Sequence, residues 1–484
     1  MHKRFVINLV SRLVMFVSII MLVPLAWATY DNPHSSEETA FIITILLGIL
    51  TSVFLRLRYP VKKIDYDRVN AKDGLAIVGL SWIVVSAFGA LPLLLSHVVG
   101  GYTDAFFEIA SGFTTTGASI FSDVEALPKG ILLWRSLTQW LGGMGIIVLY
   151  LALLPAFSQN AFQLYKAEAP GITVERAEPR IKETAKRLWS VYFILSFAEL
   201  VLLMVFGMPV FDALCHTFAT MATGGFSTKN ASVAAYGPQI QWVITVFMFL
   251  AGANFVLHYH ALKGGVKHYW RSEEFRFYCG LTVLAIAFFT VKLSLTALSY
   301  NPLRDAAFQV VSILTTTGFS TANFDAWPHA LRFTLLMLMF IGGCGGSTGG
   351  GMKVVRFFVA MKVGLRSVVQ SIFPHAVVPI KFEKKPLHDK LIMGILSYFI
   401  IFTMLFFFGT IIFVITERCD LDTAYSASIA ALSNIGPGLG QVGATQNYAW
   451  VSVPGKWLLI FLMLAGRLEL YSILILFLPA TWKK

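Results

Sequence analysis

The sequence predicts an all-α protein that crosses a membrane many times and contains one structural unit written four times. Three observations predict this class: the composition, the recurrence of long apolar runs, and a Thr- and Gly-rich motif that occurs four times. Hydrophobic residues make up 56% of the 484 positions, charged residues make up 13%, and the mean hydropathy is +0.71. Soluble domains carry about 25% charged residues, so the composition excludes a soluble globular protein.

Apolar runs of about 20 residues are long enough to cross a bilayer core as a helix, and they recur along the whole chain. We predict ten spans, near residues 5–29, 39–57, 74–99, 131–157, 187–207, 238–262, 276–298, 330–362, 391–416 and 455–480. Glycine interrupts only the eighth of these. The lipid bilayer is therefore the expected surrounding of most of the chain.

The net charge of +12 is distributed unevenly between the loops. Lys and Arg are concentrated after the second span and before the fifth, seventh and ninth spans, whereas the loops on the opposite side have few. This is the bias of cytoplasmic loops, and it predicts that both termini are cytoplasmic. The same bias accounts for the basic net charge, so we expect no nucleic-acid partner.

The chain divides into an N-terminal transmembrane hairpin and four repeats. The hairpin, residues 1–60, lacks the Thr- and Gly-rich motif, and we interpret it as an appendage. Each repeat contains a span, a short amphipathic run, the motif and a second span. The predicted repeats are residues 72–157, 187–264, 276–364 and 391–482. In each repeat an Ala lies twelve positions before the last Gly of the motif, which places the four motifs in one register.

The short runs before the motifs are too short to cross a bilayer, and by the charge rule they enter from the outside and turn back. They are residues 104–113, 212–221, 305–314 and 423–432, and their expected N-caps are Asp104, Asp212, Asp305 and Thr423. The C-terminus of each short helix then directs its partial negative charge toward the membrane centre. That arrangement favours a cation at the centre.

The loop after each short helix must be buried in protein or line a water-filled path, because its backbone groups would be unsatisfied in lipid. Four such loops around one axis predict a selectivity filter, in which backbone carbonyl oxygens replace the hydration shell of a cation. A single loop of this kind is more often a simple turn, but four in one register favour a pore. The predicted ligands are Thr115, Thr116, Gly117, Thr223, Gly224, Gly225, Thr316, Thr317, Gly318, Asn434, Ile435 and Gly436.

A glycine-rich run, residues 342–353, interrupts the eighth span. Seven of its first ten residues are Gly, which removes helix propensity. We interpret this run as an intramembrane gating loop below the third filter segment, and the alternative is a close helix-packing patch. The expected gating residues in it are Gly345, Gly346, Ser347, Thr348, Gly349, Gly350 and Gly351.

Arg467 lies near the middle of the last predicted span, where a charge is costly and usually functional. Glu469 is close in sequence, but residues two apart on a helix do not face each other. We therefore expect Arg467 to repel the passing cation below the filter, and the alternative is a structural ion pair. Glu108 and Glu199 are expected to brace the short helices.

The four repeats, the Ser433–Gly438 motif and the gating loop together resemble the Trk/Ktr/HKT potassium transporter superfamily, and most closely its TrkH-type membrane subunits. The resemblance implies a four-repeat pore for potassium uptake across the bacterial inner membrane, with potassium as the substrate and no organic cofactor in this chain. Gly at all four filter positions, including Gly117, goes with potassium preference in this superfamily. The fourth loop departs from the Thr-rich pattern. The resemblance also implies a homodimer and a separate cytosolic regulatory subunit, similar to TrkA, that binds NAD and ATP.

Two other functions remain open. A secondary carrier, coupled to protons or sodium with a midplane substrate site, predicts inverted repeats rather than four loops of one orientation. A membrane hydrolase would use Ser347, since Gly345–Gly349 has the G-x-S-x-G pattern, but that motif needs a preceding strand that the sequence does not predict. We expect a protein that is not an enzyme.

Overall fold

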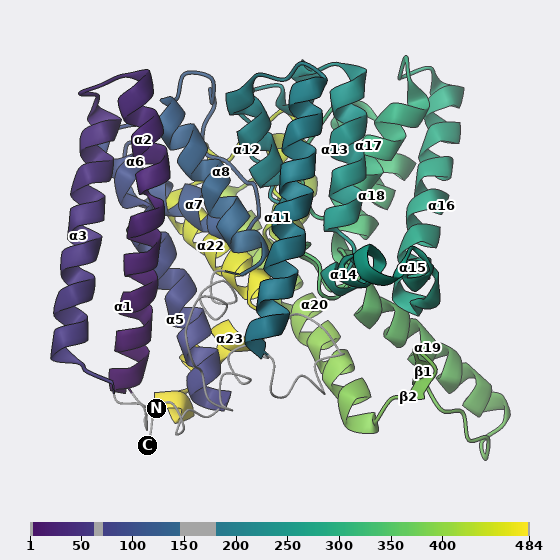
Figure 1. Ribbon diagram of the computed structural model, residues 1–484. Helices are drawn as coiled ribbons and strands as arrows, with labels where there is room; N and C mark the ends of the chain where they lie inside the picture. Colours follow the sequence, from purple (N-terminus) through teal and green to yellow (C-terminus); the bar gives the residue numbers. More distant parts are fainter. Residues whose placement is uncertain (1–2, 62–70, 146–180, 483–484) are drawn as a thin grey trace.

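The computed structural model describes residues 3–61, 71–145 and 181–482, and these are almost entirely helical (Figure 1). Strands among the described residues are confined to one antiparallel pair, β1 (Lys381–Phe382) and β2 (Lys385–Pro386). Six of the described helices are long and apolar enough to cross a membrane, or eight spans if each of two bent helix pairs counts as one. The predicted fold class, an all-α polytopic membrane protein, is confirmed.

The N-terminal hairpin packs tightly on the first repeat rather than standing apart from it. It consists of α1 (Lys3–Ile20), α2 (Leu22–Asp31) and α3 (Ser36–Arg58). The Glu37 carboxylate, only 2% exposed, accepts a hydrogen bond from the backbone N–H of Ile131 in the first turn of α8 (3.2 Å). A negative charge at a helix N-terminus is stabilising, so Glu37 fixes the hairpin against the first repeat.

Each repeat has a long outer helix, a short helix, a loop and an inner helix. Repeat 1 has α5 (Ala71–Gly89), extended by α6 (Leu91–Leu95), then α7 (Tyr102–Phe113) and α8 (Lys129–Gly143); repeat 2 has α11 (Ile181–Val205), α12 (Val210–Met221) and α13 (Pro238–Ala251); repeat 3 has α16 (Glu273–Thr296), α17 (Pro302–Leu314) and α18 (His329–Ile341); repeat 4 has α20 (Asp389–Glu417), α21 (Leu421–Leu432) and α22 (Val453–Arg467). The short helices α12 and α17 lie in the half of the molecule away from both chain ends (Figure 1).

The four short helices exist where the sequence predicts them, but each begins two or three residues earlier. The predicted N-caps are therefore wrong. The residues that occupy the N-cap position are Gly101, Pro209, Asn301 and Asp420. The three predicted Asp caps stand in the first helical turn and bind side chains instead, namely Asp104 to Lys456, Asp212 to Thr228 and Asp305 to Ser299. A first-turn carboxylate still complements the helix dipole.

The inner helices break at about the same level in three repeats. The predicted interruption of the eighth span is confirmed, since residues 342–353 separate α18 from α19 (Val354–Ile372). The predicted continuity of the sixth and tenth spans is wrong. The chain bends by 100° between α13 and α14 (Phe255–Gly264), and by 120° between α22 and the helical segment Tyr471–Phe477. Hydropathy does not detect these breaks because both halves of each pair are apolar. The continuation of the fourth predicted span beyond residue 145 lies outside the described residues.

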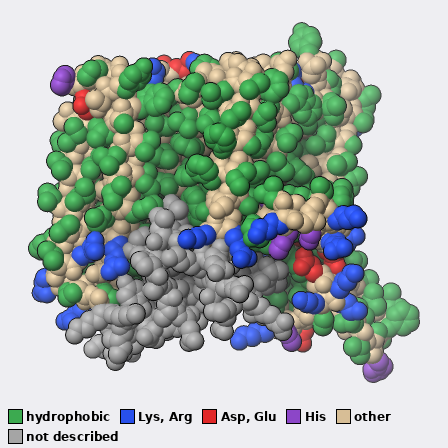
Figure 2. Space-filling model, viewed as in Figure 1, with side chains coloured by type: hydrophobic (Ala, Val, Ile, Leu, Met, Phe, Trp, Pro, Cys, Tyr) green, Lys and Arg blue, Asp and Glu red, His purple; other side chains and the backbone are tan. Residues whose placement is uncertain are grey.

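The outer surface has the character expected for contact with lipid. Figure 2 shows hydrophobic side chains over most of the visible face, with Lys and Arg gathered in a band toward the end that carries both chain termini in Figure 1. The helix α20 exposes large apolar side chains, among them Ile400, Phe407 and Ile411. The remaining described α-helices are α15 (Lys267–Arg271), α23 (Tyr471–Leu474) and α24 (Pro479–Trp482).

Candidate cation pore

The four motif loops meet in a closed ring, which we call the filter ring (residues 114–117, 222–225, 315–318 and 433–436). The last Gly of each loop has a φ between 78° and 93°. A Cβ on any of these glycines would overlap the carbonyl oxygen of the residue that precedes the next glycine in the ring. The pairs are Gly117 with Gly224, Gly225 with Thr317, Gly318 with Ile435, and Gly436 with Thr116. The contacts run through the repeats in chain order and return to the first, so one polypeptide encloses one axis.

The backbone of the filter ring is the same in all four repeats. Each short helix ends in a Schellman motif. In this motif two backbone N–H groups after the helix donate hydrogen bonds to carbonyl oxygens of the last helical turn, and the residue after the C-cap is left-handed. The left-handed residues are Thr115, Thr223, Thr316 and Asn434. The hydrogen bond that spans five residues measures 2.8 Å in every repeat, from the N–H of Thr116 to Ser111, Gly224 to Ala219, Thr317 to Ser312 and Ile435 to Ala430. A left-handed residue other than Gly costs about 1–2 kcal/mol, and such strain is typical of functional sites.

A buried ion pair holds the first filter loop. The Glu108 carboxylate on α7 pairs with the Arg135 guanidinium on α8 at 2.6 Å, and both side chains are at most 2% exposed. Glu108 also accepts hydrogen bonds from the Ile120 backbone N–H (2.9 Å) and the Ser119 hydroxyl (3.0 Å), both after the filter glycine. The predicted bracing role of Glu108 is therefore confirmed. Glu199 is fully buried on α11, the outer helix beside α12.

Repeats 2 and 4 brace their loops with other side chains of their short helices. In repeat 2 the His216 ring contacts the Ser227 hydroxyl through Nε2 at 3.0 Å. In repeat 4 the Ser426 hydroxyl oxygen accepts a hydrogen bond from the Leu439 backbone N–H at 2.8 Å. The loops share a backbone, whereas the side chains that support them differ from repeat to repeat.

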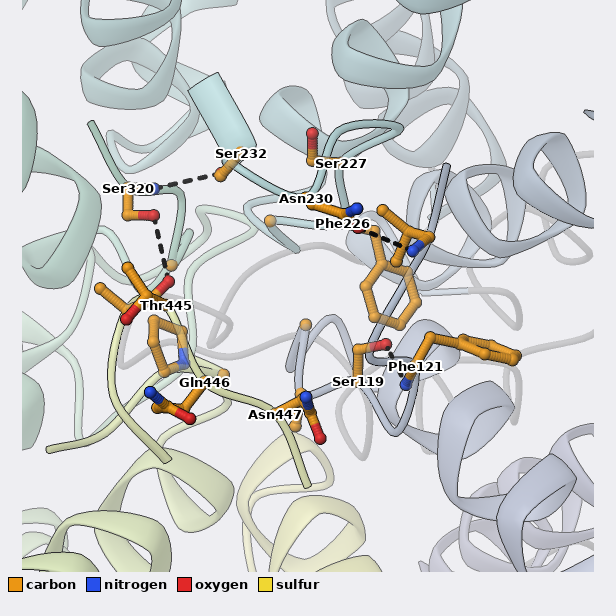
Figure 3. Close-up of a pocket in the computed structure, with 18 of the residues that line it drawn as sticks. Ser119, Phe121, Phe226, Ser227, Asn230, Ser232, Ser320, Thr445, Gln446 and Asn447 are labelled. Carbon is orange, nitrogen blue, oxygen red and sulfur yellow. Dashed lines mark hydrogen bonds between the residues drawn. The ribbon is translucent and has the colours of Figure 1, made fainter. Parts of the chain in front are cut away.

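A cavity of about 130 Å³ lies over the filter ring, lined by residues from all four repeats including the four filter glycines. Figure 3 shows polar side chains around this cavity, among them Ser119, Asn230 and Ser320. Asn230 joins repeats 1 and 2, since its side-chain amide donates to Asp123 at 2.7 Å. That hydrogen bond lowers the pKa of Asp123, and the Asn230 backbone N–H lowers the pKa of Glu125. Both carboxylates are therefore ionised at neutral pH, and Glu125 pairs at 3.1 Å with Lys229, whose side chain lines the cavity.

The gating loop (342–353) lies directly against the underside of the filter ring. The Gly350 N–H donates to the Thr316 hydroxyl oxygen at 2.6 Å, and the Gly351 N–H donates to the Ser433 carbonyl oxygen at 3.0 Å. The Thr348 hydroxyl donates to the Met221 carbonyl oxygen, at the end of α12, at 3.0 Å. The loop thus contacts the filter ring in repeats 3 and 4 and the end of the short helix in repeat 2.

Arg467 joins the gating loop to the first repeat. Its guanidinium donates to the Thr348 carbonyl oxygen at 2.7 Å and to the carbonyl oxygens of Gly142 and Gly143 at the end of α8, at 2.5 and 2.7 Å. Glu469, two residues on, forms an ion pair with Arg356 of α19. Arg467 therefore lies on the level of the gating loop, with its positive charge directed at a cluster of backbone oxygens.

The remaining residues of the gating loop hold its shape. The Gly345 N–H donates to the Glu274 carboxylate at 2.6 Å, and the Gly346 carbonyl accepts from the Phe255 N–H at 3.0 Å. The Ser347 hydroxyl donates to the Cys344 carbonyl oxygen at 2.6 Å. Because helix α18 precedes this segment, Ser347 lacks the strand-to-helix setting of a nucleophile elbow. Gly349 accepts from the Lys353 ammonium.

Several residues of the pore were not singled out from the sequence. Gln139 on α8 binds the second filter loop, and the Tyr448 hydroxyl donates to the Gly436 carbonyl oxygen at 2.7 Å. Thr114 and Thr315 pair through their hydroxyls with filter residues Thr116 and Thr317, each at 2.8 Å. The two threonines could have been found from the Thr-Thr-Thr-Gly motif itself. No local pattern distinguishes Gln139 or Tyr448, because their partners are distant in sequence.

Four re-entrant loops that close into a ring within one chain define a membrane protein with a four-repeat, cation-type pore. Comparison with known proteins identifies the class: residues 39–484 match the TrkH family, described as cation transport proteins. The chain belongs to the TrkH family.

Relatives that match over their whole length include the Trk system potassium uptake proteins TrkH of Salmonella typhimurium, at 38% identity, and of Halomonas elongata, also at 38%; in both, the alignment covers 100% of each chain. The crystal structure of the potassium transporter TrkH from Vibrio parahaemolyticus is similar to this one with a TM-score of 0.89, at 36% identity over 100% of both chains.

Proposed function

We propose that this protein takes up potassium ions across the inner membrane of a bacterial cell, through the filter ring. The observation that carries the proposal is the closed ring of four left-handed glycines, each packed against the carbonyl of the next loop. Relatives at 38% identity over the full length are named potassium uptake proteins, which supports potassium as the ion. In this reading potassium is the substrate, and the chain is a transporter with no enzymatic step and no organic cofactor.

The ligands of the dehydrated ion are backbone carbonyl and Thr hydroxyl oxygens of the filter ring. The proposed set is Thr115, Thr116, Gly117, Thr223, Gly224, Gly225, Thr316, Thr317, Gly318, Asn434, Ile435 and Gly436. Neutral oxygens suit this role, because an ion must bind well enough to lose its water and weakly enough to leave. The C-termini of the four short helices add partial negative charge at the same place.

Residues Gly345–Gly351 and Arg467 control the flow below the filter ring. The gating loop binds the filter ring and Arg467 through hydrogen bonds to Thr316, Ser433 and Arg467, and further hydrogen bonds tie it to Met221, Glu274 and Phe255. Each contributes about 1 kcal/mol, so a movement that breaks only the bonds to the filter ring and Arg467 costs about 3 kcal/mol. The Arg467 charge adds an electrostatic barrier, about 2 kcal/mol for a monovalent ion about 8 Å away at an effective dielectric constant of about 20.

The orientation of the protein in the membrane and its partners are part of the same proposal. The end with the Lys and Arg band and both termini faces the cytoplasm, in keeping with the distribution of basic residues in membrane proteins. Two copies form a homodimer with one pore in each chain. The basic loops receive a cytosolic, NAD- and ATP-binding subunit of the TrkA type, as the word "system" in the names of the relatives supports.

Ion flux into proteoliposomes tests the function. The purified protein should carry potassium in preference to sodium, and Gly117→Ser should reduce that preference, because the new side chain displaces the Gly224 carbonyl. A pH gradient imposed in a parallel set separates a passive pore from a proton-coupled carrier. Equal permeation of potassium and sodium by the unmodified protein would refute potassium selectivity, and an unchanged ratio in Gly117→Ser would refute the filter assignment.

A further inference from the structure

The second filter loop differs from its neighbours in what supports it from behind. In repeats 1 and 3 the residue before the filter glycine is Thr116 or Thr317, and its hydroxyl pairs at 2.8 Å with the threonine two positions earlier. Repeat 2 has Ala222 and Gly224 at these positions, so neither hydroxyl is present. The loop nevertheless keeps the same backbone, with Thr223 left-handed and the same 2.8 Å Schellman bond from Gly224.

The space left by the missing side chain is occupied by Gln139, which comes from the inner helix of repeat 1. A Cβ on Gly224 would overlap the Gln139 side-chain amide, with its oxygen and nitrogen at 2.7 and 2.8 Å. The Gln139 side chain is fully buried. It therefore stands where the Thr side chain stands in repeats 1 and 3.

Gln139 also binds the loop on both sides of the filter glycine. Its Nε2 donates to the Gly224 carbonyl oxygen at 2.7 Å, and its Oε1 accepts from the Phe226 backbone N–H at 3.1 Å. Gly225 lies between these two residues. The Gly224 carbonyl is moreover the one that packs against Gly117, so the amide acts on the junction between the first and second loops.

We propose that Gln139 is a positioning residue for ion selectivity, which substitutes across the repeat boundary for the side chain that repeat 2 lacks. The inference rests on the proposed function of the filter ring. Discrimination between cations depends on where the carbonyl oxygens lie and on the strength of their dipoles. A hydrogen bond donated to a carbonyl oxygen fixes the direction of the carbonyl group and polarises it. Removing the donor therefore changes both the position of the oxygen and the strength of the carbonyl dipole.

The first test replaces the amide by an apolar side chain of similar length, Gln139→Met. In proteoliposomes the ratio of potassium to sodium permeability should fall between about twofold and about tenfold, the range expected for one net hydrogen bond. The melting temperature in detergent should fall, because the Gly224 carbonyl and the Phe226 N–H lose their partner, so the permeability ratio is compared with that of a control that also loses a buried amide. The matched control is Gln241→Met, since Gln241 is a buried amide on α13 that binds the Tyr236 carbonyl oxygen at 2.9 Å outside the filter ring.

The second test places a Thr side chain at position 224 of repeat 2, the position that Thr occupies in repeats 1 and 3. Gly224→Thr alone should impair selectivity, because its side chain collides with Gln139, and Gln139→Ala alone should impair it by removing the support. The double variant Gly224→Thr with Gln139→Ala should recover selectivity relative to both single variants. Because residues in contact couple in stability whatever their role, the readout is the permeability ratio, and a double variant whose ratio is no better than that of either single one overturns the inference.

The two proposals fail in different ways. If the unmodified protein does not prefer potassium, the proposed function fails. If it prefers potassium and Gln139→Met keeps the same permeability ratio, the filter assignment stands and the role of Gln139 is refuted. Should Gln139→Met not fold, the recovery in the double variant decides the question.

Discussion

At the filter ring the four repeats adopt one backbone conformation, whereas directly beneath it they do different things. The Schellman motif and the left-handed glycine recur four times with the same 2.8 Å hydrogen bond. One level below, repeat 3 contributes the gating loop and repeat 4 contributes Arg467, while repeats 1 and 2 contribute mainly backbone groups that bind them. The proposed function accounts for this difference: an ion on the axis needs equivalent ligands around it, whereas a gate needs only one element that moves.

The difference between the filter ring and the layer beneath it predicts which property each variant should change. Changes in the filter ring and its braces should alter selectivity or stability, and changes in the layer beneath should alter the rate of flux and leave selectivity in place.

The largest effect is expected from Glu108→Ala, which leaves Arg135 buried without its carboxylate partner. Breaking a buried ion pair in this way costs about 3–5 kcal/mol, so the free energy of unfolding in detergent should fall by that amount. Glu125→Ala is the control, since the Glu125–Lys229 pair is about 40% exposed and should contribute less than about 1 kcal/mol. Similar losses for both variants would contradict the bracing role of Glu108.

Gly318→Ala should come next. Its φ of +83° is unfavourable for Ala by about 1–2 kcal/mol, and the added Cβ collides with the Ile435 carbonyl oxygen. We expect the potassium-to-sodium permeability ratio to fall by on the order of tenfold. Gly280→Ala on α16, where a Cβ meets no neighbouring atom within 4 Å, provides the control. A Gly318→Ala protein with an unchanged potassium-to-sodium permeability ratio would show that the filter ring does not discriminate between these ions.

Arg467→Ala should raise potassium flux on the order of tenfold, because it removes the charge barrier and releases the gating loop at Thr348. Selectivity should stay the same, in contrast to Gly318→Ala. Arg467→Lys keeps the charge but lacks the planar guanidinium that binds several carbonyls at once, so an intermediate flux is expected. A lower flux in a well-folded Arg467→Ala protein would rule out the barrier.

Ser347→Ala should have the smallest effect, a change in flux of about twofold to threefold, since it removes one hydrogen bond inside the gating loop. Ser367→Ala, on the exposed part of α19, is the control. The same measurement separates a gate from an enzyme, because a hydrolase that uses Ser347 would lose all activity on this replacement.

Much of the pore could be predicted from the sequence because its signals are local. An apolar run that ends in Thr and Gly locates three of the short helices to within three residues, the matched register locates the fourth, and glycine density alone predicts the break at 342–353. The N-caps were misplaced because an acidic residue is favourable anywhere in the first helical turn, so Asp104 marks a helix start without fixing the cap. The bends after α13 and α22 were missed because hydropathy does not change across them.

The sequence by itself determined that the chain lies in a membrane, that one unit recurs four times, and that the loop after each short helix must be buried in protein or line a water-filled path. These properties depend on composition and on neighbouring residues. Only the tertiary structure decided that the four glycines close into one ring, that Gln139 from repeat 1 supports the loop of repeat 2, and that Arg467 binds the end of α8. Those contacts join residues that are 85 to 325 positions apart. Their geometry follows from how the helices pack together, which no local pattern of residues specifies.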